Sequence, residues 1–175
     1  NDWFSANVTF VFAHELFTGT TATTFNPSAP MTRAMLVTVL HRLAGNPEST
    51  GASIFGDVDS DMWYADAVNW AAEIGIVGGI GGNLFAPEVD ITREQMAVIF
   101  TNFARVMDIA LPKKRNGGFL DASEIGDWAK DAVEAMFAAG IINGKPGELF
   151  DPKATATRAE VAAMLHAFLQ ALAGE

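Results

Sequence analysis

The sequence has no cysteine and is short of basic side chains. The absence of cysteine excludes disulfide bridges and metal sites built on thiolate ligands. Eleven lysine and arginine residues against 21 aspartate and glutamate residues give a formal net charge of −10, with an isoelectric point of about 4.6. We do not expect a nucleic acid as partner, because phosphate binding requires an overall basic surface. An anionic ligand would need local positive charge.

Long apolar segments are also missing. No apolar run reaches the roughly 20 residues that cross a bilayer, and no basic segment followed by an apolar one opens the chain. We therefore expect no insertion into a membrane. Apolar residues nevertheless make up 50% of the 175 positions, which is enough to bury a substantial core. The composition predicts one compact body.

The chain does contain a threefold internal repeat. A Thr-Arg pair occurs three times, and each Arg follows a Trp by 30 residues and a Gly by 14. The recurring positions are Arg33, Arg93 and Arg158, then Trp3, Trp63 and Trp128, and finally Gly19, Gly79 and Gly144. Self-similarity at a fixed spacing indicates a stack of modules, so the function should depend on what the modules share.

Each repeat predicts a helix, a Gly-rich loop and a second helix. In the second repeat, apolar residues at helical spacing predict the first helix over 62–74. The second helix is expected to begin after Thr92 and to reach about Met107. Thr92 and Gln95 have the spacing of a capping box, in which each side chain bonds a backbone amide of the other residue.

The third repeat follows the same plan, with helices predicted over 128–139 and 158–172 and a capping box of Thr157 and Glu160. The predicted modules span residues 1–46, 54–108 and 118–175. A basic cluster at 113–115 lies in the second linker, where a solvated segment is favoured over a binding patch.

The shared Arg is expected at the first position of each second helix, where the helix dipole disfavours a cation by about a few tenths of a kcal/mol. Such an Arg, beside amide groups of the helix start and a Gly loop, could hold a carboxylate. Equally, it could bridge to an acidic side chain of a neighbouring module. Residue types alone leave both open. For the shared Trp, stacking on a sugar and filling the core are both possible, and residue type favours the core.

Little in the chain suggests a metal, a cofactor or catalysis. Asp57, Asp59 and Asp61 begin like a calcium loop, but Met62 and Val68 stand where Gly and a bidentate Glu are needed. The histidines have no partner at metal-ligand spacing, and no carboxylate pair of the kind used for glycoside hydrolysis stands out. We expect no metal, no cofactor and no enzymatic activity.

Short motifs in the second and third repeats match those of a known family. They are Phe55-Gly-Asp-Val58, Gly75-Ile-Val-Gly-Gly79 and Ile91-Thr-Arg-Glu-Gln95 in the second repeat, and Gly140-Ile-Ile-Asn-Gly144 and Thr157-Arg-Ala-Glu160 in the third. With these motifs the chain resembles the S-layer homology family over nearly its whole length. The resemblance implies an all-α fold, in which three helix-loop-helix modules form a pseudo-trimer around a central bundle of the second helices.

The resemblance also implies a function. It suggests a non-catalytic, secreted module that anchors a protein at the cell wall by binding secondary cell-wall polysaccharide bearing a pyruvate ketal. The implied binding residues are Arg33, Arg93 and Arg158, which would pair with the ketal carboxylate, and Trp3, Trp63, Trp128, Gly19, Gly79 and Gly144, which would line grooves between modules. The alternative is a self-assembly module of a surface layer, acting with regions outside this sequence, whose Arg residues make salt bridges between modules.

Two repeats depart from the family pattern. The first has Met35 where the capping Glu is expected and Glu15-Leu16 in place of Gly-Ile before the loop, so we expect Arg33 to matter less for binding than the other two Arg residues. The second has Glu94-Gln95 in place of Ala-Glu. Because Gln95 can still cap the helix, only a slight change of its groove is expected.

Overall fold

The structure is a computed structural model that describes residues 2–21, 24–51 and 53–173. Within these ranges the chain forms six α-helices and two short 3₁₀ helices and no β-strand, so the predicted all-α class is confirmed. The α-helices are α1 (Ser5–Ala13), α2 (Arg33–Leu43), α3 (Ala65–Glu73), α4 (Arg93–Val106), α5 (Lys130–Ala138) and α6 (Arg158–Ala173), and the 3₁₀ helices are η1 (Ala122–Glu124) and η2 (Asp127–Ala129).

The second helix of each repeat begins directly after its Thr, as predicted. At α4 the capping box is complete, because the Thr92 hydroxyl accepts from the amide of Gln95 and the Gln95 side chain accepts from the amide of Thr92. The third repeat forms the same box. In the first repeat Thr32 accepts from the amide of Met35 at 3.2 Å, but the apolar Met35 side chain cannot complete the box.

The first helices are shorter than predicted. α3 begins at Ala65 rather than at residue 62, so Trp63 lies in the turn before the helix. In the third repeat Trp128 belongs to η2, and α5 starts two residues later at Lys130. Neither Trp therefore lies on the apolar stripe of its helix, which leaves both rings free to face another module.

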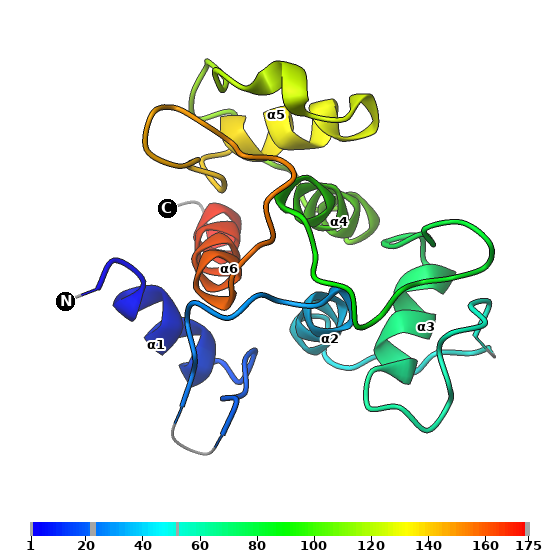
Figure 1. Ribbon diagram of the computed structural model, residues 1–175. Coiled ribbons are helices and arrows are strands. Elements are labelled where there is room, and N and C mark those ends of the chain that lie inside the picture. The colour runs from blue at the N-terminus through cyan, green and yellow to red at the C-terminus, as the bar shows by residue number, and fades with distance from the viewer. Residues whose placement is uncertain (1, 22–23, 52, 174–175) are drawn as a thin grey trace.

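Helices from successive repeats pack together. In Figure 1, α2, α4 and α6 surround the middle of the molecule, and α1, α3 and α5 lie outside them. The closest helix pairs are α2 with α3, α4 with α5, and α6 with α1. Each inner helix thus packs against the first helix of the next repeat, and the third repeat packs against the first. The two helices of one sequence repeat are not the unit of packing.

A closed ring of backbone hydrogen bonds joins the residues that precede the three capping Thr residues. The amide of Met31 donates to Ala156 at 2.9 Å, that of Ala156 to Ile91 at 2.9 Å, and that of Ile91 to Met31 at 2.8 Å. Each repeat therefore bonds both of the others at this point. All three residues are buried, so these amides and carbonyls satisfy one another away from water.

The first backbone amides of the second helices also form hydrogen bonds between modules. In α2, the amide of Arg33 donates to Val89 and that of Ala34 to Pro87, each at 3.0 Å. The corresponding pairs are Arg93 with Ala154, Glu94 with Pro152, Arg158 with Ala29, and Ala159 with Pro27. These helix-start amides are therefore already bonded, and they are not free to hold a carboxylate as the sequence suggested. Anion recognition at this point would depend on the Arg side chain.

The basic linker is not wholly solvated, contrary to the expectation from sequence. Arg115 is half-buried and donates from Nε to the carbonyl of Phe137 at 2.7 Å and from Nη1 to Asn143 Oδ1 at 3.0 Å, while its Nη2 bonds the carbonyl of Ile142. Its guanidinium also lies 3.9 Å from the centre of the Phe137 ring. Arg115 thereby ties the linker to the end of α5.

Candidate functional site

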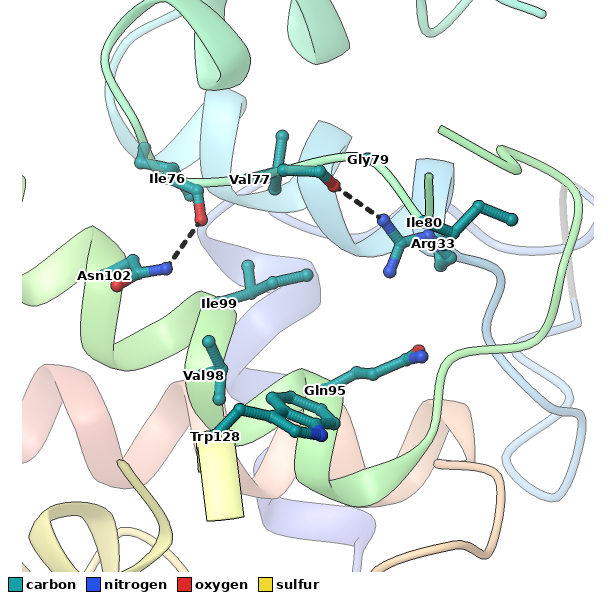
Figure 2. A pocket seen from close by; sticks show the side chains of 11 residues that line it. Arg33, Ile76, Val77, Gly79, Ile80, Gln95, Val98, Ile99, Asn102 and Trp128 are labelled. Atoms are coloured by element: carbon teal, nitrogen blue, oxygen red, sulfur yellow. Dashed lines mark hydrogen bonds between the residues drawn. The ribbon is translucent and has the colours of Figure 1, made fainter. Parts of the chain in front are cut away.

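Three grooves of similar make-up lie between the modules. Each contains one shared Arg, one shared Gly and one shared Trp, and we name each groove after its Arg. The Arg33 groove, of about 450 Å³, has Gly79, Gln95, Asn102 and Trp128 in its lining (Figure 2). The Arg93 groove, of about 500 Å³, has Trp3, Asn7, Gly144 and Glu160. The Arg158 groove, of about 240 Å³, has Gly19, Met35, Arg42 and Trp63.

All nine residues singled out from the sequence line these grooves. The Arg, the Gly and the Trp of one groove, however, come from three different repeats. In the Arg33 groove, the Arg comes from the first repeat, Gly79 and the wall of α4 from the second, and Trp128 from the third. The other two grooves follow the same rotation. Every groove consequently depends on all three modules.

Arg33 lines its groove and is buried, with 5% of its surface exposed. Its Nε donates to the carbonyl of Phe85 at 2.8 Å and its Nη2 to the carbonyl of Gly78 at 3.1 Å; Figure 2 shows the second bond. The guanidinium also lies 4.6 Å from the centre of the Phe85 ring. These contacts connect the first repeat to the loop of the second and fix the direction of the guanidinium.

The other two Arg residues repeat the Nε contact. Arg158 donates from Nε to Phe25 at 2.8 Å and from Nη2 to Thr18 at 2.7 Å. Arg93 donates from Nε to Phe150 at 2.7 Å, and its Nη1 makes an ion pair with Glu160 at 2.5 Å. Among the described residues, Arg93 alone of the three forms the ion pair with a neighbouring acid that the sequence left open. The other two bridge modules through carbonyl groups.

Burial lowers the pKa of the guanidinium groups of Arg33, Arg93 and Arg158 below the ordinary value for arginine. Desolvation is the largest cause in each case; Asp57 opposes it at Arg33, and Glu160 is the largest opposing group at Arg93. At Arg158 desolvation acts alone. An arginine still keeps its proton near neutral pH. Each groove therefore contains a charged group that has lost much of its water, and such a group is stabilised by an anion nearby.

The shared Trp residues are exposed, so the core position that residue type favoured is wrong. Trp3, Trp63 and Trp128 are 65%, 58% and 59% exposed, whereas the fourth Trp, Trp70, is buried. Each of the three exposed indoles lines the groove of an Arg from a different repeat. An exposed indole offers an apolar face together with a polar N–H, which suits a sugar ring.

The shared Gly residues allow the groove loops to close tightly. Beyond Gly79, the amide of Ile80 donates to the carbonyl of Leu84 at 2.8 Å, and a Cβ on Gly79 would lie 2.6 Å from that carbonyl oxygen. Gly19 and Gly144 are equally confined by carbonyl oxygens, at 2.3 and 2.8 Å from such a Cβ. The shared Gly is thus required by the shape of the loop.

Gly79→Ala is expected to destabilise the fold by about 1–3 kcal/mol, because a backbone carbonyl must shift to admit the methyl group. The adjacent Gly78→Ala is the matched control, since a Cβ there meets nothing within 4 Å. Urea unfolding of both variants provides the measurement. Equal losses of stability in the two variants would show that the close approach to the Leu84 carbonyl is not the reason for a Gly at position 79.

Two aspartates position the Arg contacts, and our interpretation of the sequence missed them. The carboxylate of Asp57 accepts from the amides of Phe85 and Ala86 at 2.8 and 2.7 Å. Desolvation raises the pKa of Asp57, but these hydrogen bonds and the Arg33 charge outweigh it, so the pKa lies below its ordinary value. Asp121 holds the third repeat's loop in the same way. The Phe-x-Asp motif that opens both repeats is the sequence feature that could have indicated these two aspartates.

Glu94 of the second repeat makes two contacts that an Ala at this position could not make. Its buried carboxylate accepts from the amide of Gly126 at 2.9 Å through Oε2, and its Oε1 pairs with Lys153 at 2.5 Å. Gly126 stands two residues before Trp128. Glu94 therefore ties the segment that carries this Trp to the start of α4, where the other repeats have Ala34 and Ala159.

The loop of the first repeat keeps the shape of the others despite its departure from the motif. Glu15 has a φ of 57°, close to the 76° of Gly75 and the 77° of Gly140. The amide of Leu16 bonds back to Val11 at 3.0 Å, as the other loops do at the same place. The substitution therefore leaves this turn intact, although a side chain in this left-handed conformation costs about 1–2 kcal/mol.

The described part of the chain contains no group of three or more His, Cys, Asp or Glu side chains arranged to hold a metal ion. No helix in the same part is long and apolar enough to cross a membrane.

This combination of three helical modules and three inter-module grooves defines a helical tandem-repeat protein. The S-layer homology domain family matches residues 1–34, 54–97 and 118–162, and the chain belongs to that family. Membership of this family of non-catalytic surface modules indicates a secreted, cell-wall-associated protein.

Similar proteins include both enzymes and surface proteins. An amylopullulanase of Thermoanaerobacterium thermosulfurigenes is 34% identical over 173 residues, which cover 97% of this chain and 9% of the relative. A cellulosome-anchoring protein of Acetivibrio thermocellus is 29% identical over 83% of this chain and 33% of its own length. The S-layer protein sap of Bacillus anthracis is 30% identical over 77% of this chain and 15% of its own length. The chain thus spans a third or less of each of these relatives.

Proposed function

We propose that this chain anchors a larger protein to the cell wall by binding an acidic polysaccharide, specifically secondary cell-wall polysaccharide bearing pyruvate ketals. One observation carries the proposal: each groove places a buried Arg guanidinium beside an exposed Trp ring from another module. The first supplies charge for a carboxylate, and the second supplies an apolar face for the attached sugar.

The hydrogen bonds of Arg33 support a carboxylate as its ligand. Nε and Nη2 are directed at two carbonyl groups, whereas Nη1 donates to no protein atom among the described residues. The remaining donor belongs to a cation that two neighbouring bonds hold in place. A carboxylate at this point would form a charge-assisted hydrogen bond without first having to order the side chain.

The walls of the grooves favour binding over hydrolysis. Glycoside hydrolysis uses two carboxyl groups on either side of the scissile bond. Among the described residues that line the three grooves, Glu160 is the one acid, and it is paired with Arg93. We infer that the chain holds its glycan without cleaving it and that any hydrolytic activity of the whole protein resides in other domains.

Self-assembly is the competing function, and the inter-module contacts of the Arg residues are the observation that favours it. Arg33, Arg93 and Arg158 all bridge modules within this chain, so they serve the fold whether or not they bind a ligand. In a pure assembly module the free Nη1 of Arg33 would need no ligand. Oligomers that form without glycan and dissociate when salt is added would favour self-assembly.

Calorimetric titration with a synthetic saccharide bearing a pyruvate ketal, alongside the same saccharide without the ketal, tests the proposal. We expect heat of binding from the first saccharide and none from the second, because the Arg contact requires the carboxylate. Sedimentation velocity on the same samples reports assembly. A folded protein that binds neither saccharide, or that binds both equally, would overturn the carboxylate mechanism.

A further inference from the structure

One position at which the three grooves differ in charge is the third residue after the capping Thr. This position is Gln95 in the Arg33 groove, Glu160 in the Arg93 groove and Met35 in the Arg158 groove. The backbone roles of the three residues are alike, since the amide of each donates to its capping Thr hydroxyl. What varies is the group presented to the groove: a neutral amide, a carboxylate or a thioether.

In the Arg93 groove the protein supplies its own anion. Glu160 Oε1 lies 2.5 Å from Arg93 Nη1, and the two side chains are only 18% and 6% exposed. The other oxygen, Oε2, accepts from the amide and the hydroxyl of Thr157 at 2.8 and 2.9 Å. The carboxylate is therefore held at both oxygens, and it uses the Arg93 nitrogen that remains free on Arg33.

The other two grooves have no such internal anion. Figure 2 shows the Gln95 amide extending from α4 below the Arg33 guanidinium, with no hydrogen bond drawn between them. In the Arg158 groove, Met35 is apolar and Arg42 adds a second cation, whose Nη1 donates to the carbonyl of Leu16 at 3.3 Å. Counting the charged side chains of each lining, the charge is +1 in the Arg33 groove, zero in the Arg93 groove and +2 in the Arg158 groove.

We propose that this one position decides which grooves accept an anionic ligand: Glu160 closes the Arg93 groove to a ligand carboxylate, and the Arg33 and Arg158 grooves are the binding sites. The inference rests on the proposed function and adds to it the identity of the selecting residue. A ligand carboxylate entering the Arg93 groove would lie beside Glu160, where like charges repel and the charge of Arg93 is already paired. This order replaces the one expected from sequence, which ranked Arg93 above Arg33.

An exchange of the two residues tests the proposal. Glu160→Gln gives the Arg93 groove the group found in the Arg33 groove, and Gln95→Glu does the reverse. Both variants retain a capping side chain, because Gln and Glu each complete the box in this protein. Glu160→Gln removes the partner of a buried Arg and is expected to lower the melting temperature. Gln95→Glu adds a partner, so it keeps the test informative if the first variant folds poorly.

The Trp residues allow each groove to be observed separately. The chain has four Trp residues: Trp128, Trp3 and Trp63 line the Arg33, Arg93 and Arg158 grooves, and Trp70 is buried. Their indole N–H signals in a ¹H–¹⁵N spectrum, assigned with single Trp→Phe variants, report the occupancy of each groove. The probe is the synthetic saccharide with a pyruvate ketal, and Trp70 is the internal control.

We expect the saccharide to shift the signals of Trp128 and Trp63 in the unaltered protein and to leave Trp3 in place. Glu160→Gln should make the Trp3 signal shift, with at least tenfold tighter binding at that groove. Gln95→Glu should weaken the Trp128 response at least tenfold and leave that of Trp63 unchanged. If the unaltered protein shifts all three signals alike, or the exchange leaves the pattern unchanged, this inference is wrong while the proposed function stands. If no signal responds in the folded protein, both fail.

Discussion

Arg33→Ala is expected to weaken binding of a pyruvylated saccharide at its own groove about 10- to 100-fold, because one charge-assisted hydrogen bond contributes about 1.5–3 kcal/mol. The same change should destabilise the fold by about 2–4 kcal/mol. It removes the donor to the carbonyls of Phe85 and Gly78, although the cost of burying the charge is relieved at the same time. Titration observed at the Trp128 indole measures the first effect, and urea unfolding measures the second.

Two control variants separate these effects. Arg105→Ala removes an exposed Arg on α4 that donates to the carbonyl of Gly75 and lines none of the three grooves, so it should change neither quantity much. Arg33→Lys keeps the charge but loses the planar fork, so affinity should fall less than in the Ala variant. An affinity at Trp128 that survives Arg33→Ala would show that the ketal carboxylate is recognised elsewhere.

Features governed by local rules could be predicted from the sequence. The second helices begin after Thr92 and Thr157, where the capping residues can be identified without knowledge of the fold. The fixed spacing of Arg, Gly and Trp indicated three equivalent sites, and these residues do lie together in three grooves. Short-range hydrogen bonding and periodicity suffice for predictions of this kind.

Features that depend on which module packs against which could not be predicted. A repeat pattern is the same whether Arg33 contacts its own Gly loop or that of the next repeat, and the structure has the second arrangement. The exposure of Trp128 has the same origin, because the groove that it lines is formed by the first and second repeats. The assignment of Trp to the core rested on residue type alone, which carries no information on the packing of modules.

Some of the missed information was present in the sequence. Asp57 and Asp121 both follow a Phe by two positions, but that pattern specifies neither a target nor a direction. The structure supplies both, since each carboxylate bonds the two amides around the carbonyl that accepts from an Arg Nε. Likewise, Gln95 and Glu160 are interchangeable as helix caps, so capping alone could not show that one of them also neutralises an Arg.

Phe168→Ala is expected to be the most destabilising single change considered, at about 3–5 kcal/mol, because it opens a cavity where two inner helices meet. Phe168 on α6 is completely buried, and its ring centre lies 5.7 Å from that of Phe100 and 6.0 Å from that of Phe103, both on α4. For a chain of this size the loss corresponds to a fall in melting temperature of about 6–20 °C. Thermal unfolding followed by circular dichroism measures it.

Phe12→Ala is the matched control, because Phe12 is also a helical Phe but is 60% exposed, and its removal should cost no more than about 0.5 kcal/mol. Similar losses in the two variants would argue against a shared core between α4 and α6. Phe168 lines none of the three grooves. At a temperature where the Phe168→Ala protein is still folded, its affinity for the saccharide should therefore stay within about twofold of the unaltered value, which is well under 1 kcal/mol. A larger loss would mean that the spacing of α4 and α6 sets the shape of the grooves as well as the stability of the fold.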